Sequence, residues 1–127
     1  MRLSIVSFLV LFMFGCSTLE RPVYIRSYPK CIDVDTCFNI IRAVIESKWH
    51  IPESAAEKGL QAKLRVHLGD DKEVIKIVVV ESSGDLEFDQ TALDSIQLAK
   101  DFRELDGLSK EMFETNFRKF IMVFKPD

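Results

Sequence analysis

The sequence has no excess of basic residues. Its 17 Lys and Arg residues are outnumbered by 20 Asp and Glu residues, which gives a formal net charge of −3 at pH 7. Proteins that bind nucleic acid need a basic surface that contacts the phosphates. We therefore expect no nucleic-acid partner.

The sequence also lacks an apolar run long enough to cross a membrane. Residues 3–14 carry no charge, but a membrane-spanning helix needs about 20 residues. With Arg2 before it and small residues after it, the run is typical of a secretory signal. We expect residues 1–15 to be a signal peptide, residues 16–34 a tether and residues 35–127 the folded domain.

Residues that bind metals are few. The two histidines, His50 and His67, fall on separate predicted elements and are expected to be solvated. Cys31 and Cys37 lack the Cys-x-x-Cys spacing of zinc ligands. The acidic pair at 70–71 is far short of a calcium-binding loop. The sequence therefore predicts no metal site and no cofactor.

No arrangement of residues typical of catalysis is present. Ser82 and Ser83 lack a surrounding Gly-x-Ser-x-Gly. A strand end, a turn at Gly84 and a helix cap at Asp89 explain that stretch instead. We predict no catalytic residue and a non-enzymatic protein.

Three cysteines leave one without a partner. Cys31 and Cys37 lie close together at the start of a predicted helix, so in an exported protein we expect them to form a disulfide. Closing so short a loop is expected to stabilise the fold by about 2 kcal/mol. Cys16 is then the unpaired cysteine.

The segment Met13-Phe14-Gly15-Cys16 resembles a bacterial lipobox, in which a small residue precedes a cysteine that becomes the lipidated N-terminus. We expect Cys16 to carry a lipid anchor, with Ser17 directing the protein to the outer membrane. The alternative is ordinary signal cleavage at the small residues Gly15 and Ser17. That cleavage would discard Cys16 and leave a soluble periplasmic protein.

Residues 17–30 contain two prolines and no regular apolar period, which is typical of a tether. Alternatively, Val23, Tyr24 and Ile25 pack on the domain as an irregular strand.

Three helices are predicted from apolar residues at a spacing of three and four. The first is capped by Asp35 or Thr36, the second spans 90–102 after a cap at Asp89, and Ser109 opens a shorter third. The residues expected to face inward are Phe38, Ile41, Ile45 and Trp49 on the first helix, Ala92, Leu93, Ile96, Ala99 and Phe102 on the second, and Met112, Phe113 and Phe117 on or just after the third.

Three strands are predicted between the helices. Residues 60–68 alternate strictly between apolar and polar, which indicates one wet face. Residues 73–81 are apolar on both faces, so we expect this strand to be covered on both sides. Residues 120–124 are β-branched, aromatic or Met. The predicted fold is α+β, a three-stranded antiparallel sheet with helices packed on one face.

Several short motifs occur together in this chain. They are IESKWHIP at 45–52, GLQAKLRVHL at 59–68, IVVVESSGDLEFDQTALDSIQLAK at 77–100 and FKPD at 124–127. In combination they resemble the C-terminal periplasmic domain of TolA, of the Tol-Pal system, and more distantly the TonB C-terminal domain. The resemblance runs from about Phe38 to Asp127.

Two departures from the family pattern bear on function. The family commonly has Asp-Gly in the hairpin turn, where this chain has Asp71-Lys72. TolA also has an inner-membrane helix and a long helical region, and this chain shows neither. The resemblance therefore implies only the binding head.

The resemblance implies a non-enzymatic, periplasmic protein-binding module of the cell envelope, which binds a TolB-like or Pal-like partner by strand addition. The implied docking edge is the last strand, with Phe120, Ile121, Met122, Val123 and Phe124. Proline at Ile121 or at Met122 is expected to abolish binding, depending on which amide points outward. The alternative is a decoy or exclusion factor that imitates the TolA head and captures phage coat proteins or colicins.

Overall fold

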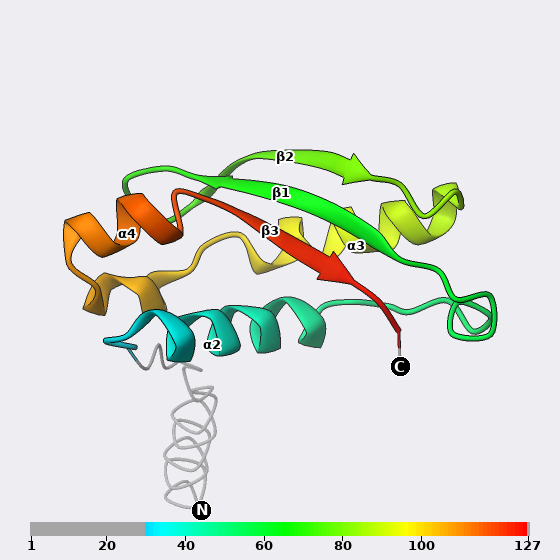
Figure 1. The fold of residues 1–127 in the computed structure, drawn as a ribbon, viewed down its shortest axis with the longest axis horizontal. Coiled ribbons are helices and arrows are strands. Elements are labelled where there is room, and N and C mark those ends of the chain that lie inside the picture. Colours follow the sequence, from blue (N-terminus) through cyan, green and yellow to red (C-terminus); the bar gives the residue numbers. More distant parts are fainter. Residues whose placement is uncertain (1–29, 127) are drawn as a thin grey trace, which may run out of the picture.

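The computed structural model describes residues 30–126 (Figure 1). The expected signal peptide, Cys16 and the tether up to residue 29, with Val23, Tyr24 and Ile25, lie outside the described residues. Cys31, near the expected end of the tether, is only 3% exposed and belongs to the core. In the part of the chain described, no helix is long and apolar enough to cross a membrane.

The described residues form an α+β fold, as predicted. The helices are α2 (Val34–Ser47), α3 (Leu86–Ala99), the 3-10 helix η1 (Arg103–Gly107) and α4 (Lys110–Asn116). The strands are β1 (Ala62–Leu68), β2 (Val74–Glu81) and β3 (Lys119–Phe124).

The three strands form one antiparallel sheet with the order β2-β1-β3 (Figure 1). Helices α2 and α3 lie against one face of the sheet. The alternation predicted for residues 60–68 is confirmed, because every second residue of β1 from Ala62 to Leu68 is buried. The residues of β3 alternate in the same way. One sheet face therefore forms the core and the other, the outer face, is partly open.

Helix α2 begins earlier than predicted. Its cap is Asp33, whose side chain accepts a hydrogen bond from the backbone N–H of Thr36 at 2.8 Å. The prediction of a cap at Asp35 or Thr36 is wrong, because several residues that can act as a cap stand within four positions and the tertiary position of Cys31 and Cys37 selects among them.

Helix α3 also begins earlier, since its cap is Asp85 and not Asp89. The Asp85 side chain accepts from the backbone N–H of Phe88 at 3.1 Å. Asp89 lies in the first turn of the helix and accepts from the backbone N–H of Ser83 at 3.0 Å and from its Oγ at 2.6 Å. Ser82 Oγ also donates to Asp89. The Ser-Ser-Gly motif therefore joins the end of β2 to the start of α3.

The prediction that β2 is covered on both sides is wrong. Ile75 is 68% exposed, and Val79 and Val80 are also exposed. The helices cover only one face of the sheet, and two register shifts in the β1–β2 pairing turn residues of β2 outward. A continuous apolar run therefore marks a bulged edge strand here.

Two side chains expected inside lie partly outside. Phe38 is 36% exposed and Met112 is 37% exposed. Their neighbours Cys37 and Phe113 occupy the core instead. An amphipathic helix buries only the residues along one side, and the apolar spacing in the sequence does not determine which neighbouring residues form that side.

Trp49 follows α2 and joins it to α3 and β3. Its indole Nε1 donates to Thr91 Oγ1 at 3.1 Å. Its ring packs edge-on against Phe88 and Phe124, with centroids 5.6 and 5.1 Å away. The aromatic residue therefore supports the C-terminal end of β3 from inside the domain.

Candidate functional site

Strand β3 forms a regular free edge of the sheet. Its residues pair with 62–67 of β1 without any register shift. On its other side, no strand among residues 30–126 pairs with it. Phe120, Met122 and Phe124 turn into the core, whereas Ile121 and Val123 lie on the outer face and are 52% and 41% exposed. The five expected docking residues therefore divide between two roles.

The direction of the β3 amides follows from one hydrogen bond. The N–H of Leu68 donates to the carbonyl of Arg118 at 2.9 Å. Hydrogen-bonded pairs alternate with non-bonded pairs along an antiparallel ladder. Counting from Arg118, the even-numbered residues of β3 bond to β1, and the odd-numbered residues direct their N–H and C=O groups to the open side. Ile121, and not Met122, therefore carries an outward donor.

A groove of about 430 Å³ lies beside this edge. It is lined by Phe38 of α2, Arg65 of β1, Asn116 of α4 and Lys119, Phe120 and Ile121 of β3. The Phe38 ring lies 4.4 Å from the Phe117 ring and 6.4 Å from the Phe120 ring, measured between centroids. Phe38 and Phe120 therefore form the aromatic part of the groove lining, which an incoming apolar side chain can contact.

Arg118 holds the start of β3 in place. Its guanidinium donates to Asp70 Oδ1 at 2.6 Å, to the carbonyl of Leu68 at 3.2 Å and to Glu114. These hydrogen bonds from Arg118 lower the pKa of the Asp70 and Glu114 carboxyls. The β1–β2 turn, helix α4 and the residue just before β3 are therefore tied together at one end of the docking edge.

The outer face of the sheet carries a row of cations around His67. Lys76 of β2 and Lys119 of β3 are its two cross-strand neighbours. Burial lowers the pKa of the imidazole, and the charges of Lys76, Lys119 and Arg65 lower it further. The imidazole Nε2 is buried and has no hydrogen-bond partner in the described part of the chain. His67, expected to be solvated, is therefore partly enclosed among cations.

The opposite edge, on β2, is built differently. Its start is covered by the segment after α3, because Val74 N donates to the Lys100 carbonyl at 2.8 Å and Phe102 N donates to the Lys72 carbonyl at 3.0 Å. Asp101 forms an isolated bridge with Glu73. Together with the two bulges, this leaves β2 a short and irregular free edge.

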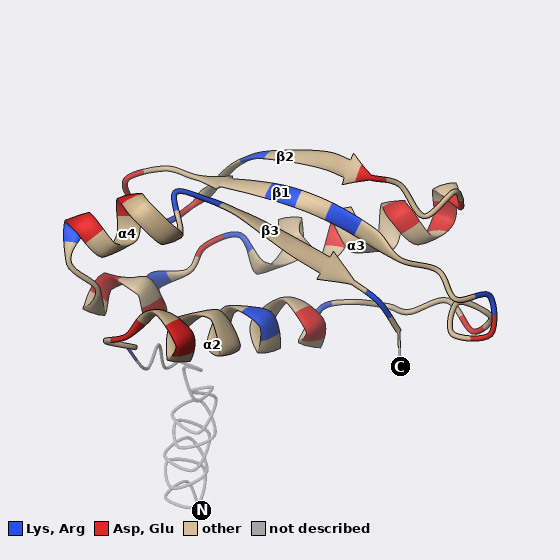
Figure 2. Ribbon diagram, viewed as in Figure 1, with Lys and Arg blue, Asp and Glu red and all other residues tan. Residues whose placement is uncertain are grey.

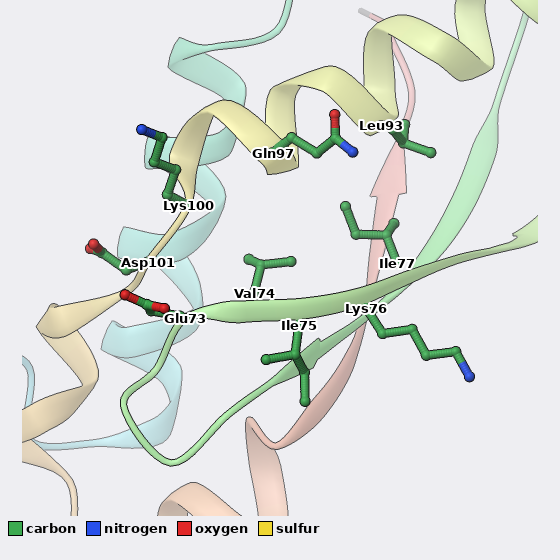
Figure 3. Close-up of a pocket in the computed structure, with 9 residues that line it drawn as sticks. All are labelled: Glu73, Val74, Ile75, Lys76, Ile77, Leu93, Gln97, Lys100 and Asp101. Atoms are coloured by element: carbon green, nitrogen blue, oxygen red, sulfur yellow. The ribbon is translucent and has the colours of Figure 1, made fainter.

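A second groove, of about 460 Å³, lies between β2 and α3 (Figure 3). Val74 and Ile77 of β2 and Leu93 and Gln97 of α3 project toward it, and Glu73, Lys100 and Asp101 close one end. Its position beside the covered start of β2 makes it a less suitable place for strand addition than the β3 edge.

The structure joins Cys31 and Cys37 by a disulfide, with their Cα atoms 5.3 Å apart. Cys31 N donates to the carbonyl of Glu104 at 3.1 Å, and a Cβ at Gly107 would lie 2.3 Å from the Cys31 carbonyl oxygen. The disulfide and this close approach fasten the start of the domain to η1.

Among the described residues, no group of three or more His, Cys, Asp or Glu side chains could hold a metal ion. The sequence predicted the docking strand but not four residues of its groove, namely Phe38, Arg65, Asn116 and Lys119. Phe38 was expected inside, and Arg65 was read only as part of a wet strand face. Their meeting depends on how α2 and α4 pack beside β3, for which the sequence carries no local signal.

The comparisons with known proteins agree with this geometry. The family model described as TonB C terminal matches residues 38–118, more than half of the chain. The Tol-Pal system protein TolA of Pseudomonas aeruginosa is 25% identical over 89 residues, which is 70% of this chain. The chain spans about a quarter of the length of that relative.

Two solved structures are similar. The NMR structure of TolAIII bound to a peptide derived from the N-terminus of TolB has a TM-score of 0.67 at 22% identity, over 87% of this chain and 83% of that one. The NMR structure of the TonB C-terminal domain of Helicobacter pylori has a TM-score of 0.49 at 20% identity, over 72% of this chain and 92% of that one. Because the family model covers residues 38–118, the chain belongs to the TonB C-terminal family, as a TolA/TonB C-terminal-like domain.

Proposed function

We propose that this domain is a non-enzymatic protein-binding module of the cell envelope. It binds an extended segment of a TolB-like or Pal-like partner as a further strand beside β3. The single observation that carries the proposal is the regular free edge of β3, with the outward amides of Lys119, Ile121 and Val123 beside an aromatic groove.

Strand addition suits these groups. Unpaired N–H and C=O groups along an edge supply main-chain hydrogen bonds, while pockets for alternate side chains supply specificity. The groove beside Phe38 and Phe120 can receive an apolar side chain of the added strand. A similar fold has been solved with a peptide from the N-terminus of TolB, which supports a TolB-like segment as the partner.

The test uses one proline variant on each edge, at a residue whose backbone N–H points away from β1. Ile121→Pro removes an outward N–H on β3. Ile77→Pro is the control. The backbone N–H and C=O groups of the odd-numbered residues of β1 point toward β2, where they bond to Lys76 and Val78. Ile77, between these two, therefore directs its N–H outward. Binding of a synthetic peptide from the N-terminus of TolB is followed by NMR titration of the labelled domain.

We expect Ile121→Pro to abolish peptide binding while circular dichroism stays unchanged, because proline removes one N–H and fixes φ. Ile77→Pro should bind as the parent does. Full binding by a folded Ile121→Pro variant would refute docking at this edge. If Ile121→Pro unfolds the domain, peptide-induced protection of the outward amides of β3 from hydrogen exchange in the parent domain decides instead.

We further propose that the protein is periplasmic and lipid-anchored to the outer membrane through Cys16. Support comes from the lipobox-like Gly15-Cys16 junction and from the pairing of the other two cysteines. The segment 17–30 could extend roughly 45 Å, enough to present the head away from the membrane. Cys16→Ala should move the protein to the soluble periplasmic fraction, and an N-terminus without lipid by mass spectrometry would refute the anchor.

A further inference from the structure

The charges of this acidic chain are unevenly distributed (Figure 2). Lys63 and Arg65 lie on β1, Lys76 on β2 and Lys119 at the start of β3. Their positions in the register place all four on the outer face of the sheet. Acidic residues are spread over the helices, with Asp35 in the first turn of α2 and Glu87 and Asp89 in that of α3. The outer face is therefore cationic although the chain has a net charge of −3.

Three of these cations are not neutralised within the described chain. Lys63 Nζ lies 3.5 Å from Glu81. Arg65, Lys76 and Lys119 make no salt bridge with any residue of 30–126. They also repel one another around His67, whose pKa they lower. A cluster of positive charges without internal partners attracts anionic groups from outside the domain, and their binding relieves the repulsion within the cluster.

Two of the three cations stand at the docking edge. Arg65 and Lys119 both line the groove beside β3, together with Phe38 and Ile121. Arg65 is directly opposite Ile121, and Lys119 is two residues away on the same face, so the two are diagonal neighbours. An added strand places every second side chain on this outer face, next to Lys119.

We propose that the segment which binds beside β3 is an acidic polypeptide, with a carboxylate on its outer face that pairs with Arg65 and Lys119. The proposal rests on the proposed strand addition and specifies the chemistry of its partner. Apolar side chains of the same segment contact Phe38 and Phe120 in the groove. Charge complementarity of this kind selects partners and speeds their encounter.

A polypeptide fits this surface better than a membrane. The cations border a groove and a row of open amides, which an extended chain can occupy and a flat lipid surface cannot. Lys30, the first described residue, lies beside Gly107 of η1. Helix α2, which follows it, lies on the side of the sheet opposite the outer face (Figure 1). The chain that leads to the proposed anchor therefore joins the domain on the side opposite the cations.

The experiment compares three synthetic peptides in which Val alternates with Glu, with Gln or with Lys. We expect the Glu peptide to bind about fivefold to tenfold more tightly than the Gln peptide, and the Lys peptide least, from the strength of partly exposed ion pairs. The preference should shrink at about 0.5 M salt. Equal affinities for the three peptides would overturn the proposal.

Two charge-reversal variants test whether the preference for the Glu peptide arises at the β3 groove. Lys119→Glu and Lys76→Glu replace the two cross-strand neighbours of His67, so they change the same charge on the same face at opposite edges. Lys119→Glu should remove the preference for Glu, and Lys76→Glu should change it less than twofold. Equal effects of the two variants would contradict a site at the β3 groove.

The outcome separates this proposal from strand addition itself. If Ile121→Pro abolishes binding of all three peptides but Lys119→Glu leaves their order unchanged, strand addition stands and the acidic partner is refuted. If Ile121→Pro leaves binding intact, strand addition fails. Binding to phosphatidylglycerol vesicles that Lys119→Glu removes, with no peptide preference, would assign the cations to a membrane and overturn the proposal.

Discussion

The two edges of this sheet are made of similar apolar residues and differ in what their backbones offer. β3 pairs with β1 without a register shift, and its outer edge has no partner strand within 30–126. β2 has two register shifts, and the residues after α3 cover its start. Bulges and a covering segment are common ways to block an edge. The difference between the two edges indicates that an added strand is blocked at β2 and can pair at β3.

The difference also shows that exposure of apolar side chains does not identify a docking edge. Ile75 on β2 is more exposed than Ile121 on β3. Yet only β3 combines exposed side chains with regularly spaced outward amides. A partner strand needs both, since its affinity comes largely from main-chain hydrogen bonds.

The largest expected effect comes from proline at Met122. Its N–H is directed to β1, and its side chain is almost fully buried. In urea unfolding, Met122→Pro should therefore destabilise the domain by about 3 kcal/mol or more, because it removes a ladder hydrogen bond and a buried side chain. The effect should be far larger than that of Ile121→Pro. Similar destabilisation by the two variants would mean that the assignment of outward amides on β3 is wrong.

Loss of the disulfide should have the next largest effect. Cys37→Ser should lower the free energy of unfolding by about 2 kcal/mol, because a short loop is no longer closed in the unfolded chain. Neither edge contains these cysteines, so peptide affinity at β3 should stay within about twofold of the parent. The parent protein in reducing buffer is the control. Free thiols at both positions in protein purified from the periplasm would contradict the pairing.

A smaller effect is expected where β2 meets α3. Burial raises the pKa of Asp89, but the hydrogen bonds from Ser82 and Ser83 outweigh it, so the pKa lies below its ordinary value of 3.8. Asp89→Asn should cost about 1 to 2 kcal/mol at neutral pH. The carboxylate contributes its stability in full above the unfolded pKa and loses it as pH falls through the folded one.

The stability difference between parent and Asp89→Asn should therefore narrow in acid. Hydrogen exchange should accelerate at the end of β2 more than in β3. A difference that stays constant down to about pH 2 would exclude the ionised carboxylate as its cause.

The smallest effect is expected in the β1–β2 turn. Lys72 has a φ of 65°, a left-handed conformation that favours glycine. Lys72→Gly relieves about 1 kcal/mol of strain. It also removes the contacts of Lys72 Nζ with Asp106 at 3.6 Å and with the Phe113 ring.

The net change in Lys72→Gly should stay within about 0.5 kcal/mol, measured by thermal unfolding. Lys72→Ala is the matched control, because it loses the same contacts and keeps the strain. If the alanine variant were as stable as the glycine variant, strain at this turn would be negligible.

Local pattern was sufficient for much of the fold. The alternation in residues 60–68, the strand at Phe120–Phe124 and the three helices follow from side chains that repeat every second residue or every third and fourth. The disulfide followed from the odd number of cysteines and the short spacing. Helix starts were less well predicted, because Asp33, Asp35, Asp85 and Asp89 are all chemically able to cap and the right one depends on what packs nearby.

By itself the sequence determined which residues form strands and helices, since those depend on neighbours along the chain. Only the tertiary structure decided that β1 lies in the centre, that β2 is bulged and that Ile121 has an outward amide. Strand order and register are set by contacts between segments far apart in sequence, and a shift of one residue exchanges the two faces of a strand. Phe38, Arg65 and Asn116 meet beside β3 for the same reason.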